Sequence, residues 1–170
     1  MAYARIQNHP YAVPGSTEYD KTQDGPQEIG QFIAISIALT GFSEAELHST
    51  GLTQVYFEEL ALIVGRDIRT EFLAANHHDP AAALHSAKWA PLARNVIRLW
   101  YLGQWKGLPA TWAKDEFGGT VPRGYNEFGR DVDRVISPQS YQEGLVWRAI
   151  GVNPPGAKQP GFASWVRKIP

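Results

Sequence analysis

The sequence contains no cysteine, and this absence excludes several chemistries at once. A chain without thiols forms no disulfide, ligates no metal or iron–sulfur cluster through thiolates, and has no cysteine nucleophile. It also lacks the glycine-rich nucleotide-binding patterns, the G-x-S-x-G elbow of hydrolases and the H-E-x-x-H zinc motif. No catalytic motif is therefore present on which an enzymatic function could be based.

The chain also has no excess of basic residues and no long apolar run. Sixteen Lys and Arg residues stand against seventeen Asp and Glu residues, so we do not expect nucleic acid as a partner. The longest apolar segment, residues 32–39, is far shorter than the roughly 20 residues that span a bilayer. The first thirty residues show neither a signal-peptide run nor paired arginines, so we expect no export signal in the chain as numbered.

Helical patterns begin after an N-terminal stretch that is rich in Pro, Gly and Tyr. We predict an extended arm over residues 1–27 and a single helical domain over residues 28–170. Apolar residues recur at helical spacing up to Gly41, which predicts a first helix. Ser43 and Glu46 form a capping box, which predicts a second helix that runs to Val64.

Proline marks three later helix starts. Asp79-Pro80 predicts a third helix through Ala87, and Pro91 predicts either a kink or a fresh start of a strongly apolar helix ending at Gly103. Ser137-Pro138 predicts a last helix before Gly151. Because no alternating strand pattern stands out, we expect an all-α fold: a compact helical domain with an N-terminal arm, a long loop and an irregular C-terminal tail.

Residues 104–136 are rich in glycine and aromatic residues, and we interpret them as an inserted loop. Trp89 and Trp100 lie in apolar helical patterns and are expected in the core. Tryptophans in or near irregular segments either fill a small satellite core or anchor an interface, and the sequence leaves both alternatives open. These residues are Trp105, Trp112, Trp147 and Trp165.

Two groups of polar residues invite a chemical interpretation. His77, His78 and Asp79 with His85 resemble metal ligands, but adjacent histidines seldom both point inward, so a solvated helix start is favoured. The acidic pairs Asp115-Glu116 and Asp131-Asp133 could serve acid–base chemistry, although neighbouring acids in glycine-rich loops are usually solvated. We predict no catalytic, cofactor-binding or metal-binding residue in this chain.

Several segments, taken in order, resemble a known family pattern. They are Phe32-x-x-x-Ser36-x-x-Leu39-Thr40-Gly41, Trp100-Tyr101-Leu102-Gly103, Tyr141-x-x-Gly144-Leu145-x-Trp147, Pro155-Gly156 and Gly161-Phe162-x-x-Trp165. The pattern is similar to the small subunit of bacterial membrane-associated, FAD-dependent sugar and polyol dehydrogenases, which include sorbitol, fructose, glucose and gluconate dehydrogenases. The resemblance covers residues 29–103 and 137–170.

The resemblance implies a non-catalytic helical subunit that binds, stabilises and helps to mature or export a large flavoprotein of the glucose-methanol-choline type. In such complexes the large subunit holds FAD, often with an iron–sulfur cluster, and some complexes add a multihaem cytochrome c. The small subunit holds no cofactor. Two features depart from the family: the twin-arginine signal and a cysteine before the aromatic tail segment are missing here. We therefore expect a periplasmic location if the partner carries the export signal, and a cytoplasmic one otherwise.

The hypothesis from the sequence is that aromatic residues in irregular segments bind this flavoprotein. The predicted partner-binding residues are Trp105, Trp112, Tyr141, Trp147, Phe162 and Trp165. The alternative is a stand-alone carbohydrate-binding or small-molecule-binding protein, or an enzyme, that uses the loop of residues 104–136 with Asp115, Glu116 or Asp131 as acids.

Overall fold

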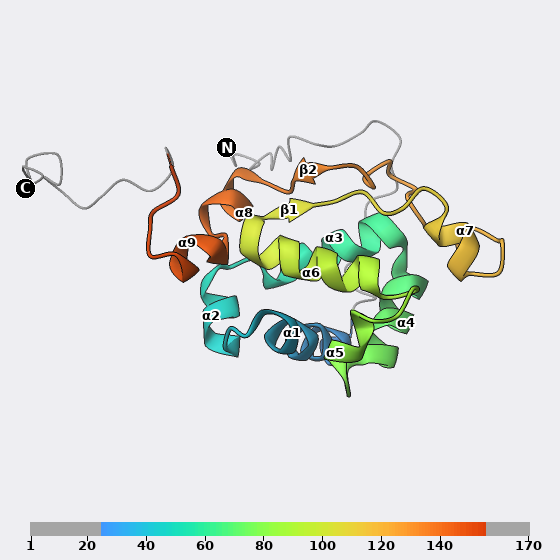
Figure 1. The fold of residues 1–170 in the computed structure, drawn as a ribbon, viewed down its shortest axis with the longest axis horizontal. Helices are drawn as coiled ribbons and strands as arrows, with labels where there is room; N and C mark the ends of the chain where they lie inside the picture. The colour runs from blue at the N-terminus through green and yellow to red at the C-terminus, as the bar shows by residue number, and fades with distance from the viewer. Residues whose placement is uncertain (1–24, 156–170) are drawn as a thin grey trace, which may run out of the picture.

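The computed structural model of the chain describes residues 25–155, which are mostly helical (Figure 1). Its elements in order are α1 (Pro26–Thr40), α2 (Glu44–Ser49), α3 (Thr53–Val64), α4 (Arg66–Asn76), α5 (Pro80–Ala83), α6 (Ala90–Leu102), β1 (Gln104–Trp105), α7 (Trp112–Glu116), β2 (Arg134–Val135), α8 (Pro138–Gln142) and α9 (Leu145–Ala149). The expected helical domain is confirmed. A short antiparallel ribbon, in which β1 pairs with β2, was not predicted.

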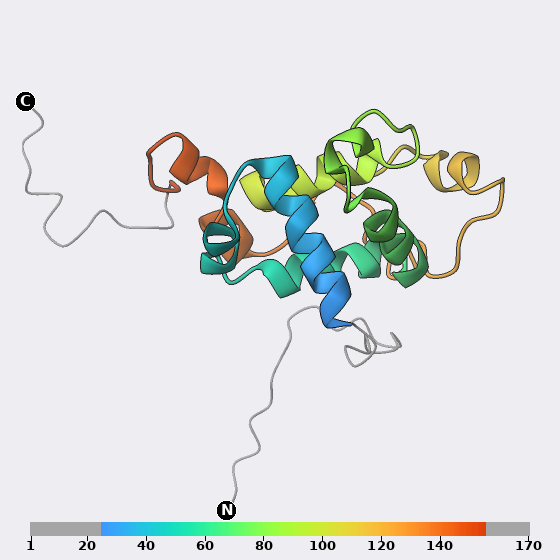
Figure 2. The same ribbon diagram turned by 90° about the horizontal axis from the view of Figure 1, so that it is seen from below.

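The core lies where α6 crosses α1 and where α3 and α4 close around them (Figures 1 and 2). Trp100 on α6 is 1% exposed, stacks on Phe32 of α1 at 6.2 Å between ring centroids, and meets the edge of Tyr56 of α3 at 5.0 Å. Trp89 is also buried, so both tryptophans expected in the core are there. Large aromatic rings from three helices thus fix how these helices cross.

The capping box at Ser43 and Glu46 is confirmed, but the helix it starts is shorter than predicted. The Glu46 carboxylate accepts the Ser43 backbone N–H at 2.9 Å, as the motif requires. The helix then ends at Ser49, and α3 begins after Gly51, whose φ of +68° is left-handed. The single helix predicted to Val64 is therefore two helices, because Gly51 turns the chain between them.

Three further helix predictions are corrected or settled. The helix from Asp79-Pro80 lasts one turn only, and α4 was not predicted at all. Pro91 lies in the first turn of α6, so it is a fresh start and not a kink. Ser137 caps α8 as expected, but Gly144 separates α8 from α9.

The two predicted terminal segments fall largely outside the described residues. Helix α1 begins at Pro26, two residues before the expected start of the helical domain at Glu28. Residues 1–24 of that arm and residues 156–170 of the C-terminal tail, with Phe162 and Trp165, lie outside the described range.

Candidate partner-binding surface

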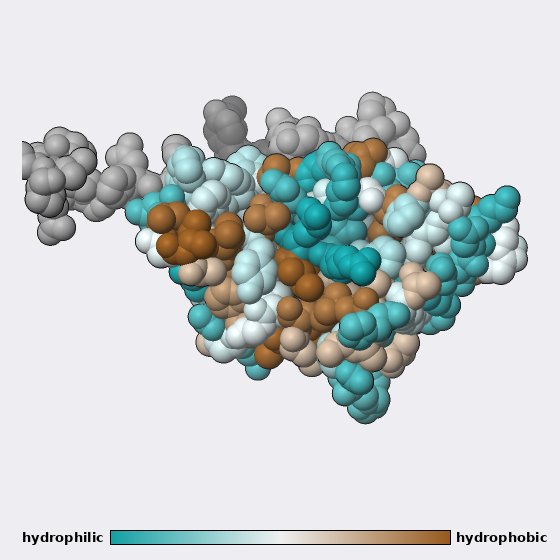
Figure 3. Space-filling model, viewed as in Figure 1, coloured by the Kyte–Doolittle hydropathy of each residue, from teal (hydrophilic) through white to brown (hydrophobic). Residues whose placement is uncertain are grey.

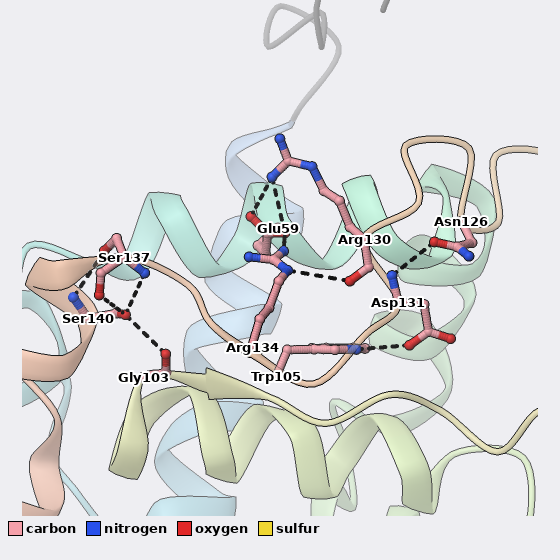
Figure 4. Close-up of polar contacts among 9 residues, drawn as sticks. All are labelled: Glu59, Gly103, Trp105, Asn126, Arg130, Asp131, Arg134, Ser137 and Ser140. Carbon is pink, nitrogen blue, oxygen red and sulfur yellow. Dashed lines mark hydrogen bonds and ion pairs between the residues drawn. The ribbon is translucent and has the colours of Figure 1, made fainter. Parts of the chain in front are cut away.

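The loop of residues 104–136 is joined internally by the carboxylate of Asp131. Its Oδ1 accepts the indole N–H of Trp105 at 2.9 Å and the backbone N–H of Leu108 at 2.9 Å. Its Oδ2 accepts the hydroxyl of Tyr125 at 2.8 Å. Burial, and then the hydrogen bond to this carboxylate, raise the pKa of Tyr125, which keeps its hydroxyl a donor. Asp131 therefore holds the two ends of the loop together (Figure 4).

A second set of contacts fastens the loop to α3. The side chain of Glu59 is only 7% exposed, and its carboxylate accepts hydrogen bonds from Arg130 at 3.1 and 3.3 Å and from Arg134. Further along, the backbone N–H of Asn126 donates to the carbonyl of Ile63 at 2.7 Å. A buried carboxylate that faces two arginines of the loop ties the loop firmly to the helical body (Figure 4).

The two loop tryptophans point into the protein. Trp105 is 2% exposed and Trp112 is 3% exposed. The indole N–H of Trp112 donates to the carbonyl of Lys88 at 2.9 Å, and its ring meets the edge of Phe117 at 5.5 Å. Of the two alternatives that the sequence left open, their burial favours packing over an interface, and both rings belong to the same hydrophobic core as Trp89 and Trp100. Neither ring has a free face for a partner in this structure.

Helices α8 and α9 lie against the end of α6 because glycines allow close approach. Gly103 has a φ of +66°, and a Cβ there would overlap the backbone of Ser140. The Ser140 hydroxyl donates to the Gly103 carbonyl at 3.0 Å. A Cβ on Gly144 would lie 2.8 Å from the carbonyl oxygen of Tyr101. Both glycines are thus required by packing, and they place the chain after residue 137 on the end of α6.

An apolar surface remains exposed on this last part of the described chain. The rings of Tyr141 and Trp147 form an edge-to-face pair at 5.4 Å, and the Trp147 indole donates to the Tyr141 carbonyl at 2.7 Å. Both side chains are half-buried, while Ile150 is 60% exposed and Val152 is 50% exposed. These four residues are called the α9 face below, and Figure 3 shows the apolar side chains gathered over α9.

The α9 face includes two residues that the sequence did not single out. Ile150 follows Trp147 by three residues, and the backbone N–H of Val152 donates to the Trp147 carbonyl at 3.0 Å. The i, i+3 spacing on a short helix that ends at a glycine was the available signal. It was missed because apolar residues at helical spacing usually face the core.

The remaining polar candidates include Asp133 in the loop and the histidines before α5. Asp133 is exposed, and hydrogen bonds from Lys106 and from the Gly107 backbone N–H lower its pKa. The rings of His77 and His78 lie 3.7 Å apart between centroids, with His77 Nδ1 at 2.9 Å from the carbonyl of Ala74. Within residues 25–155, no three His, Asp or Glu side chains are grouped as metal ligands would be.

Among the helices of the described part, none has the length and apolar character needed to cross a membrane. No family model, no curated protein and no solved structure matches this chain.

Proposed function

We propose that this chain is a non-catalytic small subunit that binds and stabilises a large FAD-dependent sugar or polyol dehydrogenase and helps its maturation or export. The observation that carries the proposal is the α9 face, where an aromatic pair and two exposed aliphatic side chains share one surface. Exposed apolar patches with aromatic members are typical of protein interfaces. The FAD, with any iron–sulfur cluster, belongs to the large partner, and some complexes would include a cytochrome c.

Three of the segments that resemble the small-subunit pattern meet in space. The Tyr101 hydroxyl donates to the carbonyl of Thr40 at 2.9 Å, which joins the end of α1 to the end of α6. Gly144 packs against the Tyr101 carbonyl, which joins α9 to the same place. Three segments far apart in the sequence thus build one end of the molecule. This arrangement supports the idea that the shared pattern serves a common structural and binding role.

The α9 face is preferred over the loop as the docking surface. The alternative function, a stand-alone binding protein or enzyme, needs the loop to offer aromatic rings and free acids. Trp105 and Trp112 are buried, and the Asp131 carboxylate accepts three hydrogen bonds from within the loop. No arrangement of the described loop residues specifically favours that alternative.

The proposal is tested by purifying the tagged chain from its native host and recording the flavin spectrum of whatever co-purifies. Ile150→Asp places a charge on the α9 face, and we expect it to reduce the co-purified flavoprotein at least about tenfold. The matched control is Val121→Asp, which alters another exposed aliphatic side chain, 55% exposed, in the segment after α7. Figures 1 and 2 show α7 and α9 at opposite ends of the molecule.

Circular dichroism and thermal unfolding establish that both variants fold like the parent chain. The control is expected to retain its flavoprotein. A parent chain that co-purifies with no flavoprotein would contradict the proposed function. Equal losses in Ile150→Asp and Val121→Asp would contradict the assignment of the docking surface.

A further inference from the structure

Three polar side-chain groups in the centre of the core have no hydrogen-bond partner among the described residues. They are the hydroxyls of Ser36 and Tyr56 and the indole N–H of Trp100. Each of these residues is at most 1% exposed, so bulk solvent does not reach them. A buried polar group without a partner is costly, and internal water molecules typically bind to groups of this kind.

The three groups come from helices that meet at the ring of Trp100. The Tyr56 ring of α3 meets the Trp100 ring edge-to-face at 5.0 Å between centroids. The Phe32 ring of α1 stacks on the other side chain contact of Trp100 at 6.2 Å between centroids. Ser36 follows Phe32 by four residues, so it lies next to Phe32 on the same buried face of α1. The two hydroxyls and the indole therefore belong to one part of the core, where α1, α3 and α6 pack together.

A fourth hydroxyl, that of Ser140, lies at the border of this part of the core. Ser140 packs on Gly103, three residues after Trp100, and its hydroxyl donates to the Gly103 carbonyl at 3.0 Å. Burial raises the pKa of Tyr56, and the Ser140 side chain offsets part of this rise although the two hydroxyls do not meet the geometry of a hydrogen bond. The Tyr56 hydroxyl therefore stays protonated at neutral pH and is able to donate.

We propose that a single buried water molecule binds between α1, α3 and α6 and is shared by Ser36, Tyr56 and Trp100. An indole N–H only donates, whereas a hydroxyl donates or accepts, so one water satisfies all three groups with about three hydrogen bonds. A larger ligand is disfavoured because the aromatic rings around Trp100 already pack at 5.0 to 6.2 Å between centroids. The site concerns the free chain and does not depend on the proposed flavoprotein.

Nuclear magnetic resonance of the isotope-labelled full chain tests whether the water is there. The Trp100 indole N–H, assigned with Trp100→Phe, should show cross-peaks to the water resonance that have opposite signs in NOESY and ROESY spectra, as a long-lived bound water gives. Trp112 is the control in the same spectrum, because it is 3% exposed but its indole already donates to the Lys88 carbonyl. No cross-peak for Trp100, or an equal one for Trp112, would overturn the proposal.

Urea unfolding tests whether the two hydroxyls share this water. Tyr56→Phe should lower the equilibrium constant that favours the folded chain about fivefold, because it removes a satisfied hydrogen bond. In a chain that already carries Ser36→Ala, and so has lost the shared water, the same change should have at most about a twofold effect. The effect of Ser36→Ala on helix propensity cancels in this comparison. Equal effects in the two backgrounds would overturn the shared water, since Tyr56 would then act through a separate contact such as Ser140. A Tyr56→Phe chain as stable as the parent would also overturn it, because its hydroxyl would then have no partner to lose.

Discussion

The loop of residues 104–136 and the segment from Ser137 to Pro155 both combine aromatic residues with glycines, but they arrange the aromatic residues in opposite ways. The loop contains five aromatic residues and five glycines, and the later segment contains two of each. In the loop the tryptophan side chains are buried. The Asp131 carboxylate accepts the indole N–H of Trp105, and the Glu59 carboxylate pairs with Arg130. In the later segment, glycines bring the backbone onto α6, while Tyr141 and Trp147 stay half-exposed beside Ile150. The presence of aromatic residues beside glycines therefore does not by itself tell whether the aromatic rings are buried or partly exposed.

The largest expected effect tests whether the loop is part of the core structure. Changing both Arg130 and Arg134 to Met leaves the Glu59 carboxylate buried without a cation, which should lower the free energy of unfolding by about 3–5 kcal/mol. Urea unfolding measures this loss. Adding Glu59→Met removes the uncompensated charge and should recover most of the stability. A loss below about 1 kcal/mol in the double variant would mean that the loop is fastened in another way.

The next effect tests the close approach that positions the α9 face. Gly41 and Gly103 both have positive φ, at +77° and +66°, but only Gly103 has atoms in the way of a Cβ. Gly41→Ala should cost about 1 kcal/mol from backbone strain alone. Gly103→Ala adds a clash with Ser140 and should cost at least about 2 kcal/mol more. Thermal unfolding of the two variants separates these contributions. Equal losses of stability would show that α8 moves away from the added Cβ without strain.

A smaller effect is expected when the internal hydrogen bonds of the loop are weakened. Asp131→Asn removes the charge and one of the acceptor oxygens, which should cost about 1–3 kcal/mol and change the fluorescence of buried Trp105. Asp115→Asn alters an exposed acid of the same loop and should stay within about 0.5 kcal/mol of the parent chain. If both variants had the same stability, the three hydrogen bonds of Asp131 would not be holding the loop.

The smallest effect concerns the pH dependence of the contact between exposed Asp133 and Lys106. The pKa of Asp133 is lowered in the folded chain, first by the hydrogen bond from Lys106. A depressed folded pKa means that this stabilisation is present above the unfolded pKa and is lost as the pH falls through the folded pKa. The Tm of Asp133→Asn should therefore lie slightly below that of the parent chain at neutral pH, and the two should converge in strong acid. A constant Tm difference across this range would contradict the assignment.

The sequence predicted helix starts best where a single residue or a short motif favours the start of a helix for a local physical reason. The capping box at Ser43 and the prolines at positions 91 and 138 are local signals, and each marks a real helix start. Helix α4 was missed although Ile68, Phe72 and Leu73 are buried at helical spacing. Its buried Arg69, which pairs with Glu28 on α1, interrupts this apolar pattern. An ion pair between residues 41 positions apart cannot be recognised from the local spacing of apolar residues.

The candidate surface was predicted only in part for a related reason. Tyr141 and Trp147 were named as partner-binding residues, and the structure brings them together. The interior position of Trp105 depends on Asp131, which lies 26 residues away, so the sequence left its role open. Phe162 and Trp165 remain predictions outside the described residues.

Hydrogen exchange measured by mass spectrometry, on the free chain and on the chain with its co-purified partner, tests the central comparison most directly. The account predicts that binding slows exchange in residues 141–152, at the α9 face, and leaves residues 104–116 unchanged because they are already packed inside the chain. Slower exchange in residues 104–116 with no change in residues 141–152 would contradict it.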